Sequence, residues 1–134
     1  MSNALYGKGK EKLLSASINL SSDTIKAAIV SSSYTANLST HEFYSDISAT
    51  VLNTPQTLGS KTITLGVFDA ADITFTAVTS GSTAKAIVIY KDTGVAGTSP
   101  LLAYIDTITG FPLATNGGDI TIVWDSGSNK IFAL

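Results

Sequence analysis

The sequence contains no arginine and no cysteine, and it has few charged residues. Charged residues make up 13% of the 134 positions, and the formal net charge is −2. Neutralising phosphates and reading bases both depend on arginine and lysine, so this composition argues against a nucleic-acid partner. The absence of cysteine excludes a disulfide scaffold and thiolate metal sites.

Long hydrophobic runs are also missing. No apolar stretch reaches the roughly 18 residues that a membrane-spanning helix needs, so we expect no membrane partner. The first twelve residues hold three lysines, but neither an apolar segment nor a cleavage site of a secretory signal follows them. We therefore expect the chain to be made in the cytoplasm.

Small hydroxyl residues are abundant, with 35 of 134 positions occupied by serine or threonine. Hydrophobic residues make up 44% of the chain, which argues against disorder at this low net charge. In residues 25–29, 63–67, 73–77 and 120–124, apolar side chains occupy every second position. This period predicts half-buried strands, several of them with threonine on the wet face.

The nearly continuous apolar run over residues 84–90 predicts a central strand that is covered on both faces. We expect residues 101–105 to be its hairpin partner and residues 131–134 to form a final strand. Residues 3–15 and 40–47 are the candidate helices, the second capped by Thr40.

Together these segments predict an all-β fold. We expect a single β-sandwich or jelly-roll-like barrel of about seven or eight strands, with one or two short helices near the N-terminal half. Residues 1–134 form a single domain in this prediction, with residues 1–12 as an N-terminal arm.

The sharpest enzymatic pattern is Asp92-Thr93-Gly94, which follows an apolar run. A single-domain aspartic protease carries one such triplet per subunit, and its dimer brings two carboxylates together. However, Asp125-Ser126-Gly127 repeats the pattern between the last two predicted strands, which indicates hairpin-turn chemistry in both places. We therefore expect no enzyme and no cofactor, and a dimeric protease that uses Asp92 stays as a minor alternative.

Other candidate sites are weaker. His41 is the only histidine, so a histidine-rich metal site is excluded, and we expect a surface or cap-adjacent side chain. Asp69 and Asp72 do not have calcium-loop spacing and are better explained by a turn. The basic start of the chain lacks the phosphate-loop pattern, but it could dock on an acidic protein surface. Its candidate interface residues are Leu5, Tyr6, Lys8, Lys10 and Lys12.

Several segments resemble a family of small virion proteins of tailed bacteriophages. They lie at both ends and in the middle of the chain: residues 3–11, 22–26, 90–94, 103–107 with 110–112, and 116–125. Members of this family are virion structural proteins, and some of them resemble capsid decoration, or cement, proteins that tie neighbouring capsomers together.

The resemblance implies a decoration protein on the capsid exterior, bound to the major capsid protein of the same phage. It also implies self-association, with a homotrimer as the first expectation and a homodimer as the second. A tail or fibre-base β-module is the alternative within the same class of virion proteins.

Overall fold

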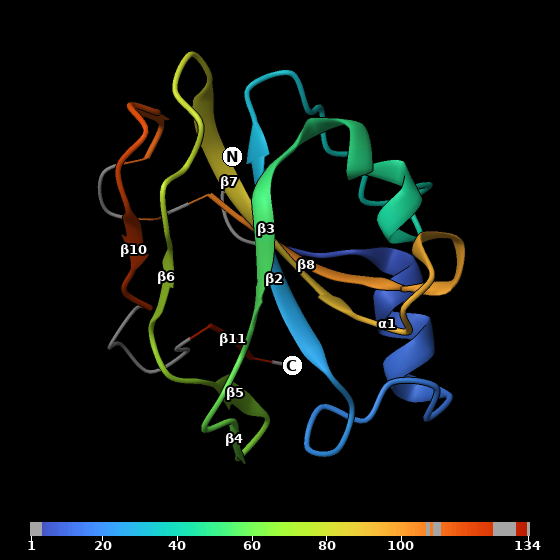
Figure 1. Ribbon diagram of the computed structural model, residues 1–134. Coiled ribbons are helices and arrows are strands. Elements are labelled where there is room, and N and C mark those ends of the chain that lie inside the picture. Colours follow the sequence, from blue (N-terminus) through green and yellow to red (C-terminus); the bar gives the residue numbers. More distant parts are fainter. Residues whose placement is uncertain (1–3, 107, 109–110, 125–130, 134) are drawn as a thin grey trace.

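The computed structural model describes residues 4–106, 108, 111–124 and 131–133. A central antiparallel sheet runs through the molecule (Figure 1). Its strands follow the order β1-β8-β7-β2-β3, and β9 pairs with the beginning of β7. Their bounds are β1 (Ala4–Leu5), β2 (Ile25–Ser31), β3 (Val51–Thr57), β7 (Thr83–Lys91), β8 (Leu101–Ile105) and β9 (Leu113–Ala114).

Two smaller antiparallel sheets complete the β structure. In one, β5 (Val67–Asp69) lies between β4 (Thr62–Thr64) and β11 (Phe132–Ala133). In the other, β6 (Ile73–Phe75) pairs with β10 (Ile120–Ile122). Figure 1 places these strands on one side of the central sheet. Side chains of all three sheets form the larger apolar core, which includes Ile29, Ile87, Phe75 and Phe68.

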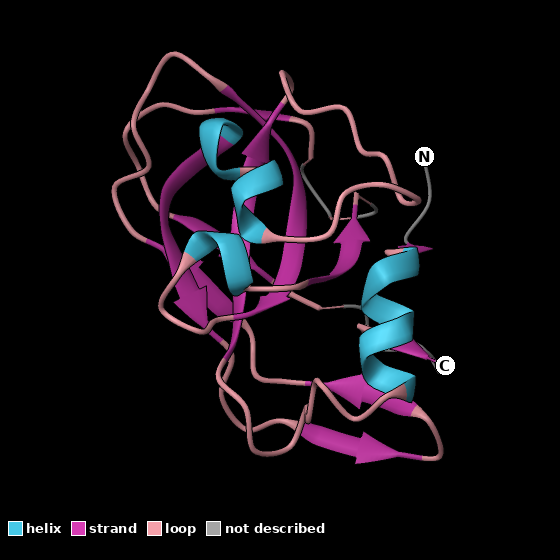
Figure 2. Cartoon of the chain, turned by 90° about the vertical axis from the view of Figure 1, so that its right-hand side faces the viewer, coloured by secondary structure: helices cyan, strands magenta, loops and turns pink. Residues whose placement is uncertain are grey.

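Helical segments lie on the other side of the central sheet (Figure 2). They are α1 (Gly7–Leu14), which packs beside β8, and three short 3₁₀ helices: η1 (Tyr44–Asp46), η2 (Ser48–Thr50) and η3 (Ala96–Thr98). A second apolar core lies on this face, and it includes Tyr6, Val30, Ile47 and Val88.

The alternation of side chains along β7 explains why its sequence is apolar almost throughout. Ile87 and Ile89 enter the larger core, whereas Val88 and Tyr90 enter the second one. Successive strand residues point to opposite faces, so a strand covered on both sides needs apolar residues at nearly every position. The predicted central strand, its pairing with β8 and the mainly β fold are all confirmed.

Two local predictions are wrong. Residues 63–67 do not form one strand, because Leu65 and Gly66 have positive φ and turn the chain between β4 and β5. β10 and β11 pair with different strands, so they do not form a hairpin with each other. The turn predicted at residues 125–129 lies outside the described residues.

The segment at residues 40–47, expected to form one or two helical turns, forms one turn, but its cap is Phe43 and not Thr40. The structure has the single-turn η1 there, and the backbone N–H of Thr40 binds the Asn37 side chain. A strand was also missed, since β3 contains Asn53 with a φ of 63° and Pro55, both of which normally disfavour a strand. The described strands are therefore more numerous than predicted.

Candidate interaction surface

The N-terminal segment, which the sequence suggested as an arm, is part of the folded domain from residue 4 onward. Ala4 and Leu5 pair with β8, and the Tyr6 N–H donates to the carbonyl of Leu102 at 2.9 Å. The Tyr6 side chain is fully buried in the second core. Of the candidate interface residues, Tyr6 therefore serves the interior, and Leu5 packs partly against the larger core.

Gly9 sets how closely α1 approaches the sheet. A Cβ built at this position would lie 2.5 Å from the carbonyl oxygen of Leu101 and 3.0 Å from the Cα of Leu102. Such contacts are shorter than van der Waals distance, so only glycine allows the helix to rest directly on the β8 backbone. The local sequence of the candidate helix over residues 3–15 does not reveal this packing role.

The lysines of α1 differ in how they are held. Lys12 forms an ion pair with Glu42 at 3.0 Å, and its ammonium lies 5.3 Å from the ring centre of Phe43. Lys8 lies 3.8 Å from Glu11, which is a loose, exposed contact. Lys10 is exposed, and its ammonium makes no polar contact among the described residues. Lys8 and Lys10 are therefore the members of the predicted set that are best placed to meet a partner.

A hydrogen-bonded chain of aromatic side chains ties the N-terminal segment to residues 34–41. The Tyr6 and Tyr34 hydroxyls lie 2.7 Å apart, and the Tyr34 hydroxyl lies 2.8 Å from His41 Nδ1. The Asn37 N–H also donates to Nδ1, at 3.3 Å, so this ring nitrogen acts as an acceptor. His41 is therefore a half-buried structural residue beside Tyr34, close to the cap-adjacent position that was expected.

Burial raises the pKa of all five tyrosines. Desolvation is the main cause at each of them, and for Tyr6 the hydrogen bond to Tyr34 adds to it. All five belong to the second core or pack against it: Tyr6, Tyr34, Tyr44, Tyr90 and Tyr104. The face of the sheet that carries the helical segments is thus a tyrosine-rich layer.

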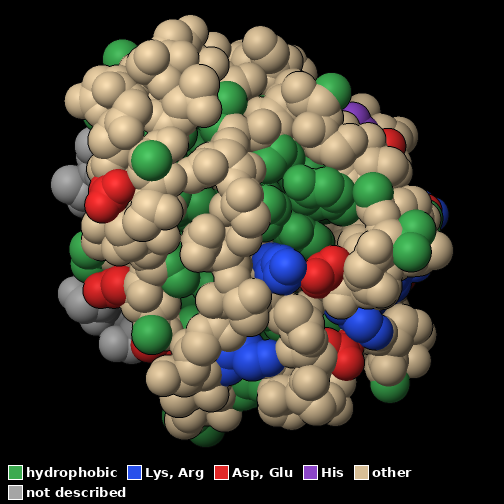
Figure 3. All heavy atoms as spheres, in the orientation of Figure 1, with side chains coloured by type: hydrophobic (Ala, Val, Ile, Leu, Met, Phe, Trp, Pro, Cys, Tyr) green, Lys and Arg blue, Asp and Glu red, His purple; other side chains and the backbone are tan. Residues whose placement is uncertain are grey.

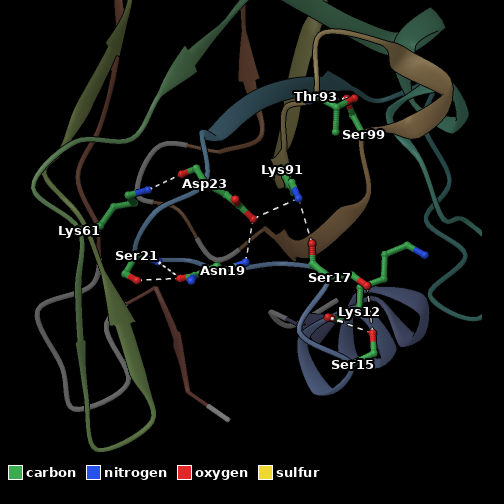
Figure 4. A network of polar contacts seen from close by, with 10 residues as sticks. All are labelled: Lys12, Ser15, Ser17, Asn19, Ser21, Asp23, Lys61, Lys91, Thr93 and Ser99. Carbon is green, nitrogen blue, oxygen red and sulfur yellow. Dashed lines mark hydrogen bonds and ion pairs between the residues drawn. The ribbon is translucent and has the colours of Figure 1, made fainter.

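Two lysine–aspartate pairs join β2 and β7 to the residues around them. Lys26 of β2 pairs with Asp92 after β7 at 3.0 Å, and Lys91 of β7 pairs with Asp23 before β2 at 3.2 Å. Figure 4 shows that Lys91 also reaches the Ser17 carbonyl and that Lys61 binds the Asp23 carbonyl. These contacts attach the segment between α1 and β2 to the sheet.

The triplet Asp92-Thr93-Gly94 lies in the turn after β7, as the hairpin interpretation predicted. The Asp92 carboxylate accepts the Gly94 N–H at 2.9 Å, and this bond and the Lys26 pair lower its pKa. The Thr93 hydroxyl lies within hydrogen-bonding distance of Thr98 and of the buried Ser99. Asp92 and Thr93 thus hold the turn together in the single chain, and the repeat at Asp125 lies outside the described residues.

The acidic residues before β6 also have structural contacts. The Asp72 carboxylate accepts the backbone N–H of Trp124, and the Trp124 indole donates to the Ala71 carbonyl. These bonds hold Trp124, just after β10, against the segment before β6, and residues 70–72 link β5 to β6 without the turn that was expected there. Within the described ranges, no three His, Asp or Glu side chains are grouped so that they could hold a metal ion.

Charged side chains are sparse on the face shown in Figure 3, where backbone, hydroxyl and amide groups cover most of the surface. No described helix combines the length and the apolar character needed to cross a membrane. Comparison of the chain with protein-family models and with curated proteins finds no match.

Proposed function

We propose that this chain is a structural protein of a tailed-phage virion, and specifically a decoration protein that binds the exterior of the major capsid protein shell. The observation that carries the proposal is the resemblance of segments at both ends and in the middle of the sequence to small virion proteins. In the fold, these segments include β1 with the start of α1, the β7–β8 turn, the end of β8 and β10.

The electrostatics of the surface support a role in close packing. Most described lysines are held by the chain itself: Lys12, Lys26 and Lys91 by carboxylates, and Lys61 and Lys85 by backbone carbonyls. Burying an unpaired charge in an interface is costly, whereas hydroxyl groups are cheaper to desolvate and easier to pair. A surface of this kind can pack against a shell with a small desolvation penalty.

A decoration protein also gains from repetition. Many copies on one lattice bind through contacts that are individually weak, because each copy is presented at high local concentration. Self-association around a local symmetry axis is expected for such an assembly, with a trimer as the first expectation. Two exposed lysines, Lys8 and Lys10, are the contact that we propose toward the capsid protein.

The position of the chain in purified particles tests the proposal. Cryo-electron microscopy should show it in a regular array on the outside of the head, with a copy number set by the capsomers. Density on the tail or fibre base would instead support the alternative, a tail or fibre-base β-module. Absence from the particle, together with peptide cleavage at acid pH that is lost in Asp92→Asn, would favour the protease.

The proposed lysine contact has its own test. Lys10→Gln should lower occupancy on capsids that lack the protein, whereas Ser80→Asp, which changes the net charge equally at a distant exposed site, should not. Equal occupancy of the two variants would show that Lys10 is not part of the contact. It would leave the proposed location of the protein unchanged.

A further inference from the structure

The hairpin of β4 and β5 presents an apolar tip that the other described residues leave largely exposed. Leu65 is 98% exposed and Ile63 is 51% exposed. Leu65 also has a φ of 52°, and with Gly66 at 78° it forms a two-residue turn of the kind that favours Asn or Asp at this position. A leucine here is both strained and solvated, and neither cost is offset by contacts within the described structure.

The outer side of β4 is an open sheet edge. β4 is the end strand of its sheet, and its pairs with β5 are Thr62 with Asp69, Ile63 with Phe68, and Thr64 with Val67. A two-residue turn closes on a hydrogen-bonded pair, here Thr64 and Val67, and the antiparallel ladder then alternates. The N–H and C=O of Ile63 therefore point away from β5, toward the open side.

This edge lacks the protection found on β3, the end strand of the central sheet. β3 carries Pro55 and the positive-φ Asn53, whose side chain also binds the Thr76 carbonyl beside it. In contrast, residues 62–68 contain no charge and no proline, and they are rich in β-branched and aromatic side chains. Segments of this composition pair readily with copies of themselves when they lie on an edge.

A lysine beside an edge strand normally discourages pairing, but Lys61 does not do so here. Its ammonium donates to the Asp23 carbonyl at 2.6 Å, and Figure 4 shows the side chain directed toward the segment before β2. The charge is thus held against the chain itself instead of projecting from the edge.

We propose that β4 pairs antiparallel with β4 of a second copy, about a two-fold axis that passes beside Ile63. The two Ile63 residues then exchange both N–H···O=C bonds, because each offers one donor and one acceptor. In this register Thr62 faces Thr64 of the second copy, and Leu65 faces Lys61, so no like charges are opposed. The two three-stranded sheets become one continuous six-stranded sheet.

The contact is small, which sets its expected strength. A stable interface buries about 800 Å² on each partner, more than a three-residue edge and two apolar side chains provide. We therefore expect a weak dimer in dilute solution and a populated contact at high local concentration. The inference does not rest on the proposed function, and a two-fold contact of this kind can also join two trimers.

Because the chain has no cysteine, a single introduced thiol tests the register directly. Opposed residues in a hydrogen-bonded antiparallel pair have Cα atoms about 5.5 Å apart, which suits a disulfide. Under mild oxidation Ile63→Cys should form a covalent dimer several-fold faster than Val123→Cys, whose parent side chain is 63% exposed. Equal rates for the two variants overturn the proposal.

Sedimentation over a range of concentrations gives the second readout, with thermal unfolding as the check that each variant folds. The unmodified chain should show a concentration-dependent dimer that Ile63→Lys abolishes and Val123→Lys retains. A chain that remains monomeric at every concentration, or an Ile63→Lys variant that still dimerises, overturns the proposal.

Discussion

Single residues determine how the N-terminal segment joins the sheet. Gly9 leaves room for the Leu101 carbonyl, Tyr6 fills the second core, and Lys12 holds Glu42. Gly9 acts because it has no side chain, Tyr6 because it is buried, and Lys12 through its charge. Substitutions at these positions should therefore give different responses.

Gly9→Ala should destabilise the protein by about 1–3 kcal/mol, since the added methyl group would overlap the β8 backbone. This loss exceeds the gain of up to about 1 kcal/mol that alanine brings to a helix interior. Chemical denaturation measures the change, and Gly97→Ala, where an added Cβ meets nothing within 4 Å, is the matched control. Equal stability of the two variants would contradict the packing role of Gly9.

Asp23 and Asp92 should make the stability depend on acid pH. Backbone hydrogen bonds from Asn19 and Gly94, and then the paired lysines, lower the pKa of these carboxyls in the fold. Groups with a lowered folded pKa stabilise above the unfolded value of about 3.9, and this contribution is lost as pH falls through the folded pKa. The paired side chains are 24–28% exposed, and each ion pair contributes at most about 1 kcal/mol.

The check compares the free energy of unfolding at neutral pH and near pH 3 in the native chain and in Asp92→Asn. The variant should lose less stability on acidification than the native chain does. An identical pH dependence in both would show that Asp92 titrates with an ordinary pKa.

At the scale of elements, the accuracy of the sequence-based prediction followed the strength of the local signal. β7 was predictable because both of its faces are buried, which leaves a nearly continuous apolar run. β3 was not predictable, since Pro55 and the positive-φ Asn53 normally disfavour a strand. They are tolerated here because β3 is an edge strand with a locally irregular backbone. The β4–β5 turn was missed because Leu65 continues the alternation of Ile63 while its backbone turns.

The candidate site was only partly predictable for a related reason. Three lysines near the start of the chain were visible in the sequence, and Lys8 and Lys10 are indeed available at the surface. The burial of Tyr6 and the pairing of residues 4–5 with β8 depend on contacts nearly 100 residues away along the chain. No local pattern carries that information.

The pairing of β1 with β8 changes the expected effect of removing residues 1–12. The sequence suggested that these residues form an N-terminal arm. Deletion removes β1, the buried Tyr6 and most of α1, so we expect a large fall in the thermal midpoint or loss of folding. Lys8→Gln with Lys10→Gln, which keeps the segment, should melt as the full chain does, and an unchanged midpoint after deletion would contradict this account.

The tyrosine-rich layer predicts an unusual alkaline titration. A group whose pKa is raised in the fold stabilises below its unfolded pKa of about 10, and this contribution is lost as pH rises through the folded value. Tyrosinate absorbance should therefore appear only as the protein unfolds above about pH 10. Circular dichroism followed in parallel tests this, and tyrosines that ionise near pH 10 in a folded chain would contradict it.

At the scale of the whole molecule, the low charge of the sequence becomes a property of its surface. The central sheet is covered on both sides, and most described lysines are held by neighbouring carboxylates or carbonyls. On the face shown in Figure 3, the surface therefore consists largely of backbone and short polar groups. Such a surface suits dense packing against neighbours, which is the physical basis of the proposed structural role.

The most direct measurement of that role is the position and copy number of the chain in purified phage particles. The account predicts an ordered array on the exterior of the head, in register with the capsomers, seen as density that fits this fold. Particles in which the chain is confined to the tail, or from which it is absent, would contradict the account.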